Sequence, residues 1–176
     1  KIVLKHKFDA EFIIQKKPNG MGDALIHFQK SIFFKKTHSI LLVWGDLPYL
    51  YKSTLSKLCH NYFLNKSFFS LVTGYQKNPY TLVIRNNKKE IIEIKEKRKN
   101  NYNINYGERD IGIFLFDKKL IWILKNNKKI DKIDKKSEHN FLYIIKYIKL
   151  NNLKISNINI TNNKEFISFN SKKDLI

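Results

Sequence analysis

The chain has 176 residues, 43% of them hydrophobic, and a formal net charge of +19. This length fits one domain with a sizeable core, and the composition excludes a disordered or fibrous protein. No apolar run reaches the roughly 20 residues that a membrane-spanning helix needs. A single cysteine, Cys59, excludes an internal disulfide framework and a cysteine-rich zinc site. A reducing, cytoplasmic location is therefore expected.

The large positive charge favours anionic partners, but its make-up argues against a dedicated nucleic-acid role. Lysine is abundant throughout, whereas the arginines are only Arg85, Arg98 and Arg109. Proteins that read nucleic acids rely on arginine for bidentate contacts. We therefore expect the charge to attract polyphosphate substrates, and a basic nucleic-acid-binding module is the less favoured alternative.

The first half of the chain predicts alternating strands and helices. Apolar runs at 10–15, 39–44 and 68–73 indicate buried strands, and apolar residues recur at helical spacing in 22–34 and 54–63. This alternation predicts an α/β fold with a three-layer, Rossmann-like, mostly parallel sheet. In such sheets ligands bind beyond the carboxyl ends of the strands.

The second half predicts a β-hairpin and further mixed elements. Residues 81–85 and 91–95 indicate two strands around a polar turn, and 111–116 indicates another buried strand. The remaining expected elements are two helices, at 118–125 and 138–150, and two short strands, at 155–160 and 166–169. We expect the hairpin at the sheet edge or as a flap over the cleft, within a single domain of residues 1–176.

Two glycines stand between an expected strand and an expected helix. The segment from Gln15 to Ala24 contains Gly20 and Gly22. Glycine lets the backbone approach a ligand closely, and a helix N-terminus favours an anion. The segment is not a P-loop, which needs Gly-Lys-Ser/Thr, and it is not a dinucleotide fingerprint, because Leu25 stands at the third glycine position. A tight strand-to-helix turn explains it equally well.

A carboxylate follows the second expected strand. Asp46 lies in Trp44-Gly45-Asp46-Leu47-Pro48, on a glycine turn at the strand's end. Mg²⁺ typically takes one or two protein carboxylates together with substrate phosphates, so a single aspartate is chemically sufficient. The alternative is an aspartate that only caps the next helix or turn.

Taken in order, these segments resemble the sugar-phosphate nucleotidyltransferases. A Gln-x4-Gly-x-Gly-x-Ala segment begins at Gln15, and the next apolar strand ends in Gly-Asp-x-Pro. The resemblance continues through 78–85, 94–97, Asp110-Ile111-Gly112-Ile113, 137–139 and Phe169-Asn170. It is greatest to the uridylyltransferase domain of bacterial N-acetylglucosamine-1-phosphate uridylyltransferases, and it spans roughly residues 10–176.

The resemblance implies a reaction and a role for each matching residue. A sugar 1-phosphate would attack the α-phosphorus of a nucleoside triphosphate, with UTP the first choice, and a UDP-N-acetylglucosamine-type product would form as pyrophosphate leaves. The implied nucleotide-binding residues are Gln15, Gly20, Met21 and Gly45. The implied sugar-binding residues are Thr81, Glu96, Asp110 and Asn170. Asp46, as the catalytic residue, would hold Mg²⁺ together with Asn170.

The chain also departs from the family's pattern. The family's Gly-x-Gly-Thr-Arg loop and Pro-Lys segment, which bind the triphosphate, do not occur in it, so we expect an N-terminally incomplete domain. Met21 stands in place of a threonine, Thr81 in place of the second glycine of Gly-Tyr-Gly, and Asp110 in place of an asparagine that contacts the sugar. An inactive remnant or a subunit of that fold is therefore the alternative to an enzyme, and the oligomeric state is open.

Overall fold

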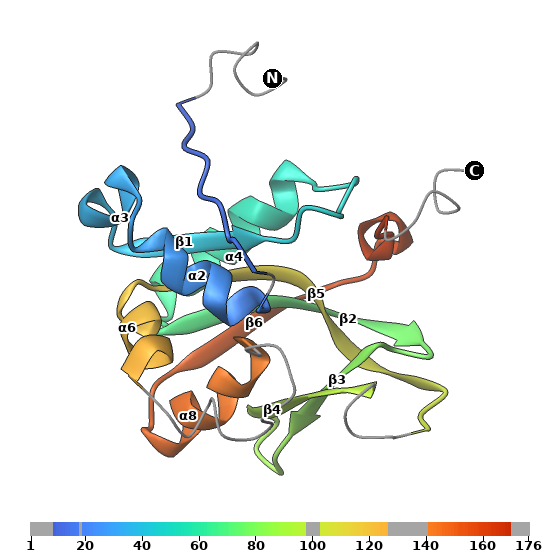
Figure 1. The fold of residues 1–176 in the computed structure, drawn as a ribbon. Coiled ribbons are helices and arrows are strands. Elements are labelled where there is room, and N and C mark those ends of the chain that lie inside the picture. The colour runs from blue at the N-terminus through green and yellow to red at the C-terminus, as the bar shows by residue number, and fades with distance from the viewer. Residues whose placement is uncertain (1–8, 18, 98–102, 127–140, 170–176) are drawn as a thin grey trace. The chain divides into compact units, whose positions relative to one another are not determined.

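The computed structural model describes residues 9–17, 19–97, 103–126 and 141–169. The chain forms two compact units. One consists of residues 1–38 and 118–141, and the other of residues 39–117 and 142–176. Figure 1 shows their helices and strands. The expected nucleotide-binding residue Gln15 belongs to the first unit, and Asp46 belongs to the second.

The larger unit is built on a four-stranded sheet with the order β1-β5-β2-β6 (Figure 1). Its strands are β1 (Ser39–Val43), β5 (Tyr106–Asp117), β2 (Phe69–Lys77) and β6 (Ile155–Ile160). β5 pairs antiparallel with both β1 and β2, whereas β2 pairs parallel with β6. β1, β2 and β6 therefore share one direction and β5 opposes them. The α/β class is confirmed, with a mixed sheet in which most strands run the same way.

Helix α4 (Lys52–Leu64) covers one face of this sheet. Its Leu58 and Tyr62 pack in one cluster with Val72 of β2 and with Ile111 and Ile113 of β5. Leu58 and Tyr62 are four residues apart and so lie on the same side of the helix. The helix expected at 54–63 is thus confirmed, and its apolar side packs against β2 and β5.

The other face of the sheet carries aromatic side chains. Residues alternate between the two faces of a strand, so Phe114 and Phe116 point away from Ile113. The ring centroid of Phe69 on β2 lies 5.8 Å from that of Phe114 and 5.9 Å from that of Phe116. All three rings are fully buried. Large buried aromatic surfaces of this kind hold β2 and β5 together.

The expected hairpin is confirmed as a separate antiparallel sheet of β3 (Thr81–Arg85) and β4 (Ile91–Glu96). In its turn, the Asn86 side-chain oxygen accepts the backbone N–H groups of Lys88 and Glu90 at 3.0 and 2.9 Å. An Asn that bonds the backbone two residues ahead is a common turn device. The pairing sets Thr81 directly opposite Glu96 at the open end of the hairpin.

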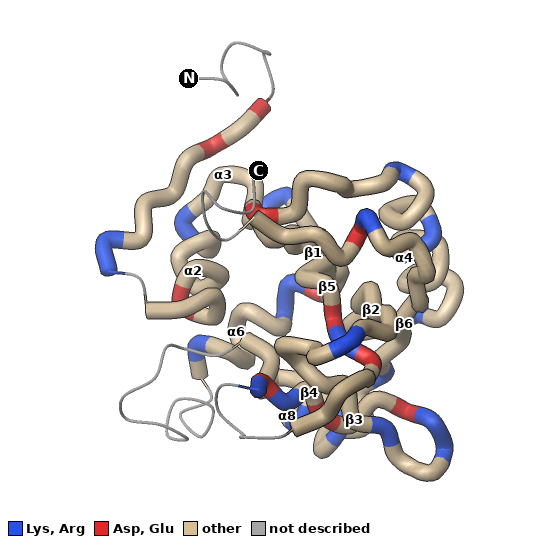
Figure 2. Tube along the Cα trace, turned by 90° about the vertical axis from the view of Figure 1, so that its right-hand side faces the viewer, with Lys and Arg blue, Asp and Glu red and all other residues tan. Residues whose placement is uncertain are grey.

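A short 3-10 helix (Phe141–Tyr143) leads into α8 (Ile144–Leu150), which lies against β4. Lys146 Nζ lies 2.7 Å from Glu93 Oε1, and Lys149 Nζ lies 3.2 Å from Glu90 Oε2. Figure 2 shows blue and red segments of the chain close together where α8 and the hairpin lie. Because the lysines are partly exposed, each pair contributes little stability, but together they orient the hairpin.

The smaller unit contains α2 (Met21–Phe28), α3 (Ile32–Lys36) and α6 (Lys119–Asn126). The single helix expected at 22–34 is therefore two helices. Ser31 lies between them and caps the start of α3. Its Oγ accepts the N–H of Phe33 at 3.0 Å and donates to Glu11 Oε2 at 2.6 Å. A serine that accepts from the backbone two residues ahead begins a new helix.

The strand expected at 10–15 is wrong. These residues are extended but make no strand pairing with the described part of the chain, and Phe12 and Ile14 are 65% and 79% exposed. Glu11 instead accepts the backbone N–H of Ile32 at 3.0 Å. An apolar run becomes a strand only where backbone partners are available, and here the segment bonds to the start of α3.

The strand expected at 166–169 is also wrong. Asn162 Oδ1 accepts the N–H of Lys164 at 3.1 Å and starts a 3-10 helix (Asn163–Phe166). The Phe166 ring then lies over Gly74 of β2, where a Cβ atom would come within 2.3 Å of the ring. A side-chain cap and a close ring-to-backbone contact thus replace the expected strand.

Candidate active site

Asp46 lies in the turn that follows β1. The strand ends at Val43, and Trp44 extends the pairing by donating its N–H to Gly112 O at 3.0 Å. The Asp46 carbonyl accepts the N–H of Phe169 at 2.9 Å. Its side-chain oxygen Oδ1 is buried and has no hydrogen-bond partner among the described residues. A buried oxygen without a partner is rare in folded proteins and is compatible with a missing ligand.

The Trp44 side chain explains a glycine of the Asp-x-Gly-Ile segment. Gly112 has φ of +79°, and a Cβ atom there would come within 2.5 Å of the Trp44 ring. Both the backbone conformation and the close approach of the indole require glycine. No local sequence pattern indicates this contact, because Trp44 and Gly112 are far apart in the chain.

Asp46 and Asp110 lie at the same end of the β1–β5 pair. These strands are antiparallel, with Val43 opposite Ile113 and Trp44 bonded to Gly112. Asp46 is two residues beyond Trp44, and Asp110 is two residues before Gly112. The topology therefore brings two carboxylates predicted for the site to one edge of the sheet.

Three of the residues expected to contact the sugar lie together at this edge. Thr81 Oγ1 donates to Asp110 Oδ2 at 2.6 Å, and Glu96 stands opposite Thr81 in the hairpin. Asp110 Oδ1 accepts the N–H of Gly112 at 3.0 Å. Thr81 and Asp110 are both 0% exposed, whereas Glu96 is half-buried. Burial, the largest effect, raises the pKa of Asp110, and the bond from Thr81 opposes that shift.

A second contact joins the hairpin to β5. Arg85 donates from Nε to Glu108 Oε2 and from Nη2 to Glu108 Oε1, both at 2.7 Å. Its Nη1 donates to Lys89 O at 2.7 Å, so the same guanidinium closes the hairpin turn. The bidentate bond to Glu108 raises the pKa of Arg85, and Glu108 is only 6% exposed. No local sequence pattern indicates this pair either, because Arg85 and Glu108 are far apart in the chain.

Asn170, the expected second magnesium ligand and a sugar contact, lies outside the described residues. Its neighbour Phe169 is described, and Phe169 donates to Asp46 O. The pairing of Asp46 and Asn170 on one Mg²⁺ stays a prediction. Within the described ranges, no three His, Cys, Asp or Glu side chains gather as a metal site.

Gln15, Gly20 and Met21 meet at the start of α2 in the smaller unit. Gly20 is the residue before the helix, with φ of +91°, and Met21 is its first residue. Gln15 Nε2 donates to Gly20 O at 3.3 Å and to Asp23 Oδ2 at 2.5 Å. The positive φ shows why glycine stands at position 20. Their expected contact with a nucleotide stays a prediction.

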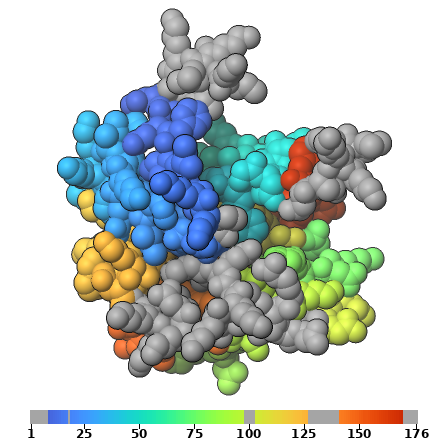
Figure 3. All heavy atoms as spheres, viewed as in Figure 1, coloured from blue at the N-terminus to red at the C-terminus, as the bar shows by residue number. Residues whose placement is uncertain are grey.

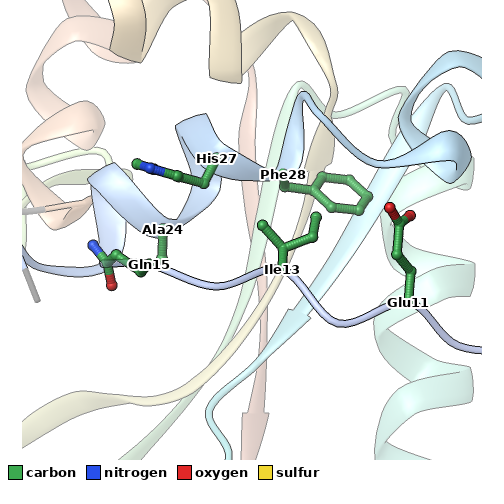
Figure 4. Close-up of a pocket in the computed structure, with 6 residues that line it drawn as sticks. All are labelled: Glu11, Ile13, Gln15, Ala24, His27 and Phe28. Atoms are coloured by element: carbon green, nitrogen blue, oxygen red, sulfur yellow. The ribbon is translucent and has the colours of Figure 1, made fainter. Parts of the chain in front are cut away.

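The extended segment before α2 and the helix enclose a pocket of about 240 Å³ (Figure 4). It is lined by Glu11, Ile13, Gln15, Ala24, His27 and Phe28. His27 Nδ1 lies 2.9 Å from Asp23 O and 3.5 Å from Asp23 Oδ2. The pocket offers one amide, one imidazole and one carboxylate around an apolar floor, which suits a small planar polar group.

Gly45 differs from the other glycines of the site. Among the described residues, no atom lies within 4 Å of a Cβ atom placed there. The space beside the Asp46 turn is therefore open, which leaves room for a ligand against the backbone.

Among the described residues, no helix is long and apolar enough to cross a bilayer.

Comparison with known proteins gives relatives over nearly the whole chain. It is 32% identical to the bifunctional protein GlmU of Buchnera aphidicola subsp. Schizaphis graminum over 170 residues, 94% of this chain and 35% of that protein. It is 30% identical over 183 residues to that of Buchnera aphidicola subsp. Baizongia pistaciae, covering 100% and 39%. The Thermosipho melanesiensis GlmU is 25% identical over 157 residues, covering 83% and 34%. The chain thus spans little more than a third of these relatives, and no family model matches it.

Proposed function

We propose, on the premise that the chain belongs to the GlmU-like nucleotidyltransferase family, that it forms part of an enzyme that makes a nucleotide sugar. The substrates would be a nucleoside triphosphate, with UTP the first choice, and a sugar 1-phosphate. The product would be of the UDP-N-acetylglucosamine type. The observation that carries the proposal is the convergence of Asp46, Asp110, Thr81 and Glu96 at one edge of the sheet in the larger unit.

The proposed reaction is a phosphoryl-group substitution at the α-phosphorus. An oxygen of the sugar 1-phosphate forms the new P–O bond, and the bond to the β-phosphate oxygen breaks, so that pyrophosphate leaves with the electron pair. Such chemistry depends on alignment and charge neutralisation more than on covalent help from the protein. The abundant lysines support it by attracting both phosphorylated substrates.

Asp46 fits a magnesium ligand. Its Oδ1 lacks a partner among the described residues, and the space that those residues leave beside Gly45 gives room for a phosphate. Asp46 would hold the ion, with Asn170 as the proposed second ligand. Bound Mg²⁺ would neutralise charge on the triphosphate. One or two protein oxygens suffice, because Mg²⁺ keeps water and substrate oxygens in its remaining positions.

Gln15 and the backbone around Gly20 would recognise the base. The amide of Gln15 already lies beside Gly20 O and can both donate and accept. Glu96, half-buried at the hairpin's open end, would accept hydrogen bonds from acceptor hydroxyls. A cytoplasmic location is part of the proposal, and it rests on the single cysteine.

Calorimetric titration and a pyrophosphate-release assay test the proposal. The chain would be titrated with UTP, CTP, ATP and GTP, each with and without Mg²⁺, and with N-acetylglucosamine 1-phosphate and glucose 1-phosphate. We expect Mg²⁺-dependent binding with UTP tightest. Pyrophosphate release should be slow, because these 176 residues contain no Gly-x-Gly-Thr-Arg segment to bind the triphosphate. Absence of binding by every nucleotide and every sugar phosphate would refute the proposal.

The second candidate is a subunit or inactive remnant of the same fold. The observation that favours it is the full burial of Thr81 and Asp110, two positions where the chain departs from the family's residues. Sequencing the gene ahead of the codon for Lys1 separates the two. If that region encodes a Gly-x-Gly-Thr-Arg loop, the extended protein should release pyrophosphate. If the extended protein binds both substrates and releases none, the second candidate holds.

A further inference from the structure

Thr81 and Asp110 are not accessible to a ligand. Both side chains are 0% exposed, and both carboxylate oxygens of Asp110 already accept hydrogen bonds, one from Thr81 Oγ1 at 2.6 Å and one from the Gly112 N–H at 3.0 Å. A sugar cannot reach side chains that are fully buried in the protein. The role that the family resemblance implies for these two residues therefore needs another explanation.

The two departures from the family's residues depend on each other. An asparagine carries its own N–H donors, whereas a carboxylate only accepts. A buried carboxylate beside a glycine would leave one oxygen without a donor, and Thr81 supplies that donor. The threonine and the aspartate thus form a single hydrogen-bonded pair that joins the first residue of β3 to β5.

Only one of the three residues at this edge remains within reach of a ligand. Glu96 is half-buried and stands opposite Thr81 in the β3–β4 ladder. The adjoining backbone is also paired, because Lys97 donates its N–H to Tyr80 O at 2.8 Å. A displacement of Thr81 from β5 would therefore move Glu96 with it.

We propose that Thr81 and Asp110 are positioning residues that fix Glu96 against β5, and that Glu96 alone of the three contacts the acceptor sugar. The Arg85–Glu108 pair joins the other end of β3 to β5, so the hairpin has two separate attachments. Of these, the Thr81–Asp110 bond is the one at the ligand end. The sugar-binding half of this inference rests on the proposed function, and the positioning half does not.

Hydrogen exchange of backbone amides tests the positioning half without any ligand. Thr81→Val removes the hydroxyl with little change of shape, and Thr81→Ser keeps it. We expect Thr81→Val to speed exchange at the open end of β4 around Glu96 by about tenfold, since a hydrogen bond to a charged group is lost. Thr81→Ser should exchange at the wild-type rate. Equal exchange in wild type and Thr81→Val would overturn the proposal.

Titration with N-acetylglucosamine 1-phosphate, followed by NMR, tests the sugar-binding half, with UTP as the control ligand. We expect Thr81→Val and Glu96→Ala each to weaken binding of the sugar phosphate about tenfold, and the double variant to be no weaker than Glu96→Ala, while UTP affinity is unchanged. Additive losses would mean that Thr81 itself contacts the sugar, which overturns the proposal. If wild type binds UTP but no sugar phosphate, the sugar-binding half is overturned. If it binds neither, the proposed function fails as well, and in both cases hydrogen exchange still decides the positioning.

Discussion

Asp46 and Asp110 are carboxylates at the same end of the β1–β5 pair, but their hydrogen bonding is opposite. Asp46 lies in an open turn, with one buried oxygen that has no partner among the described residues. Asp110 lies within β5, fully buried, with both oxygens accepting hydrogen bonds from the protein. Figure 3 shows the hairpin and part of β5, in green to yellow, next to each other at the surface.

The difference in hydrogen bonding distinguishes a residue that can bind a ligand, Asp46, from a residue that holds strands together, Asp110. A buried polar atom without a partner costs about 1–3 kcal/mol, so its presence indicates a site where a ligand can complete the bonding. Asp110 is fully buried and its two oxygens already accept bonds from the protein, so it contributes by joining strands. The family resemblance assigns both aspartates to one site, and the structure distinguishes their roles.

The largest effect is expected at the open carboxylate. Asp46→Asn should weaken Mg²⁺-dependent UTP binding at least about 100-fold, because a bound metal ion contributes several kcal/mol of charge stabilisation. The free energy of unfolding should stay within about 0.5 kcal/mol, since the buried Oδ1 has no hydrogen-bond partner among the described residues. Calorimetric titration and urea denaturation measure the two quantities.

Asp9→Asn is the matched control, because it removes the same charge at an exposed position. It should leave both quantities at the wild-type value. If Asp46→Asn behaves like this control in UTP binding, the open turn is a cap rather than a metal site, and the contrast with Asp110 disappears.

The attachment of the hairpin gives the next largest effect. Arg85→Ala should lower the free energy of unfolding by about 3 kcal/mol, because Glu108 would remain buried without its partner. Urea denaturation measures the loss. Lys88→Ala, which removes a positive charge from the exposed turn of the same hairpin, should change it by less than about 0.5 kcal/mol. Equal effects would show that the region around Asp110 does not depend on this pair.

Gly45, in the turn that contains Asp46, and Gly112, two residues after Asp110, allow the same comparison for the backbone. Gly112→Ala should cost about 2 kcal/mol or more, since the new Cβ would come within 2.5 Å of the Trp44 ring at a backbone φ of +79°. Gly45→Ala should cost little stability, because no atom of the described residues lies within 4 Å of its Cβ position, but it should weaken UTP binding if the nucleotide lies there. Thermal unfolding and UTP titration of both variants measure this. A larger stability loss at Gly45 than at Gly112 would contradict the account of the open turn.

Much of the larger unit could be predicted from the sequence. The strands at 39–43 and 155–160, the hairpin and α4 follow from local apolar patterns and turn residues, which act within a few residues of one another. The segment 10–15 has an equally strong apolar pattern and forms no strand, because pairing depends on distant chain that the pattern does not contain.

The site was predictable in part for a similar reason. The order of short motifs indicated Asp46 and Asp110, because each aspartate lies within a motif made of neighbouring residues. The contacts that bury and support Asp110 are different, because they join residues more than 20 positions apart. They are the bond from Thr81 to Asp110 and the pairing of Arg85 with Glu108. Such contacts exist only once the hairpin lies on β5, so the sequence could indicate the site but not which of its residues remain available to a ligand.

The smallest effect, and the one most specific to Asp110, is on pH dependence. Burial raises the pKa of Asp110, and the Thr81 hydroxyl, Arg109 and the Gly112 N–H oppose it. The folded protein therefore holds this proton more tightly than the unfolded chain, whose aspartates titrate near about 3.9. As the pH rises from there through the folded pKa, ionisation of Asp110 lowers the free energy of unfolding of the protein by up to about 1.4 kcal/mol per pH unit. Asp110→Asn lacks this titration.

Urea denaturation of wild type and Asp110→Asn between about pH 2.5 and pH 8 measures it, since that range begins below the unfolded pKa values of aspartate and glutamate. The free energy of unfolding of wild type should fall relative to the variant as the pH rises, and the difference should become constant above the folded pKa. Glu90→Gln is the control of opposite sign, because the bond from Asn86, and then Lys149, lowers the pKa of Glu90. Its stabilising contribution is present at neutral pH and is lost as the pH falls through that lowered pKa. If the difference between wild type and Asp110→Asn is independent of pH, burial does not raise the pKa of Asp110, and the account of Asp110 as a buried supporting residue fails.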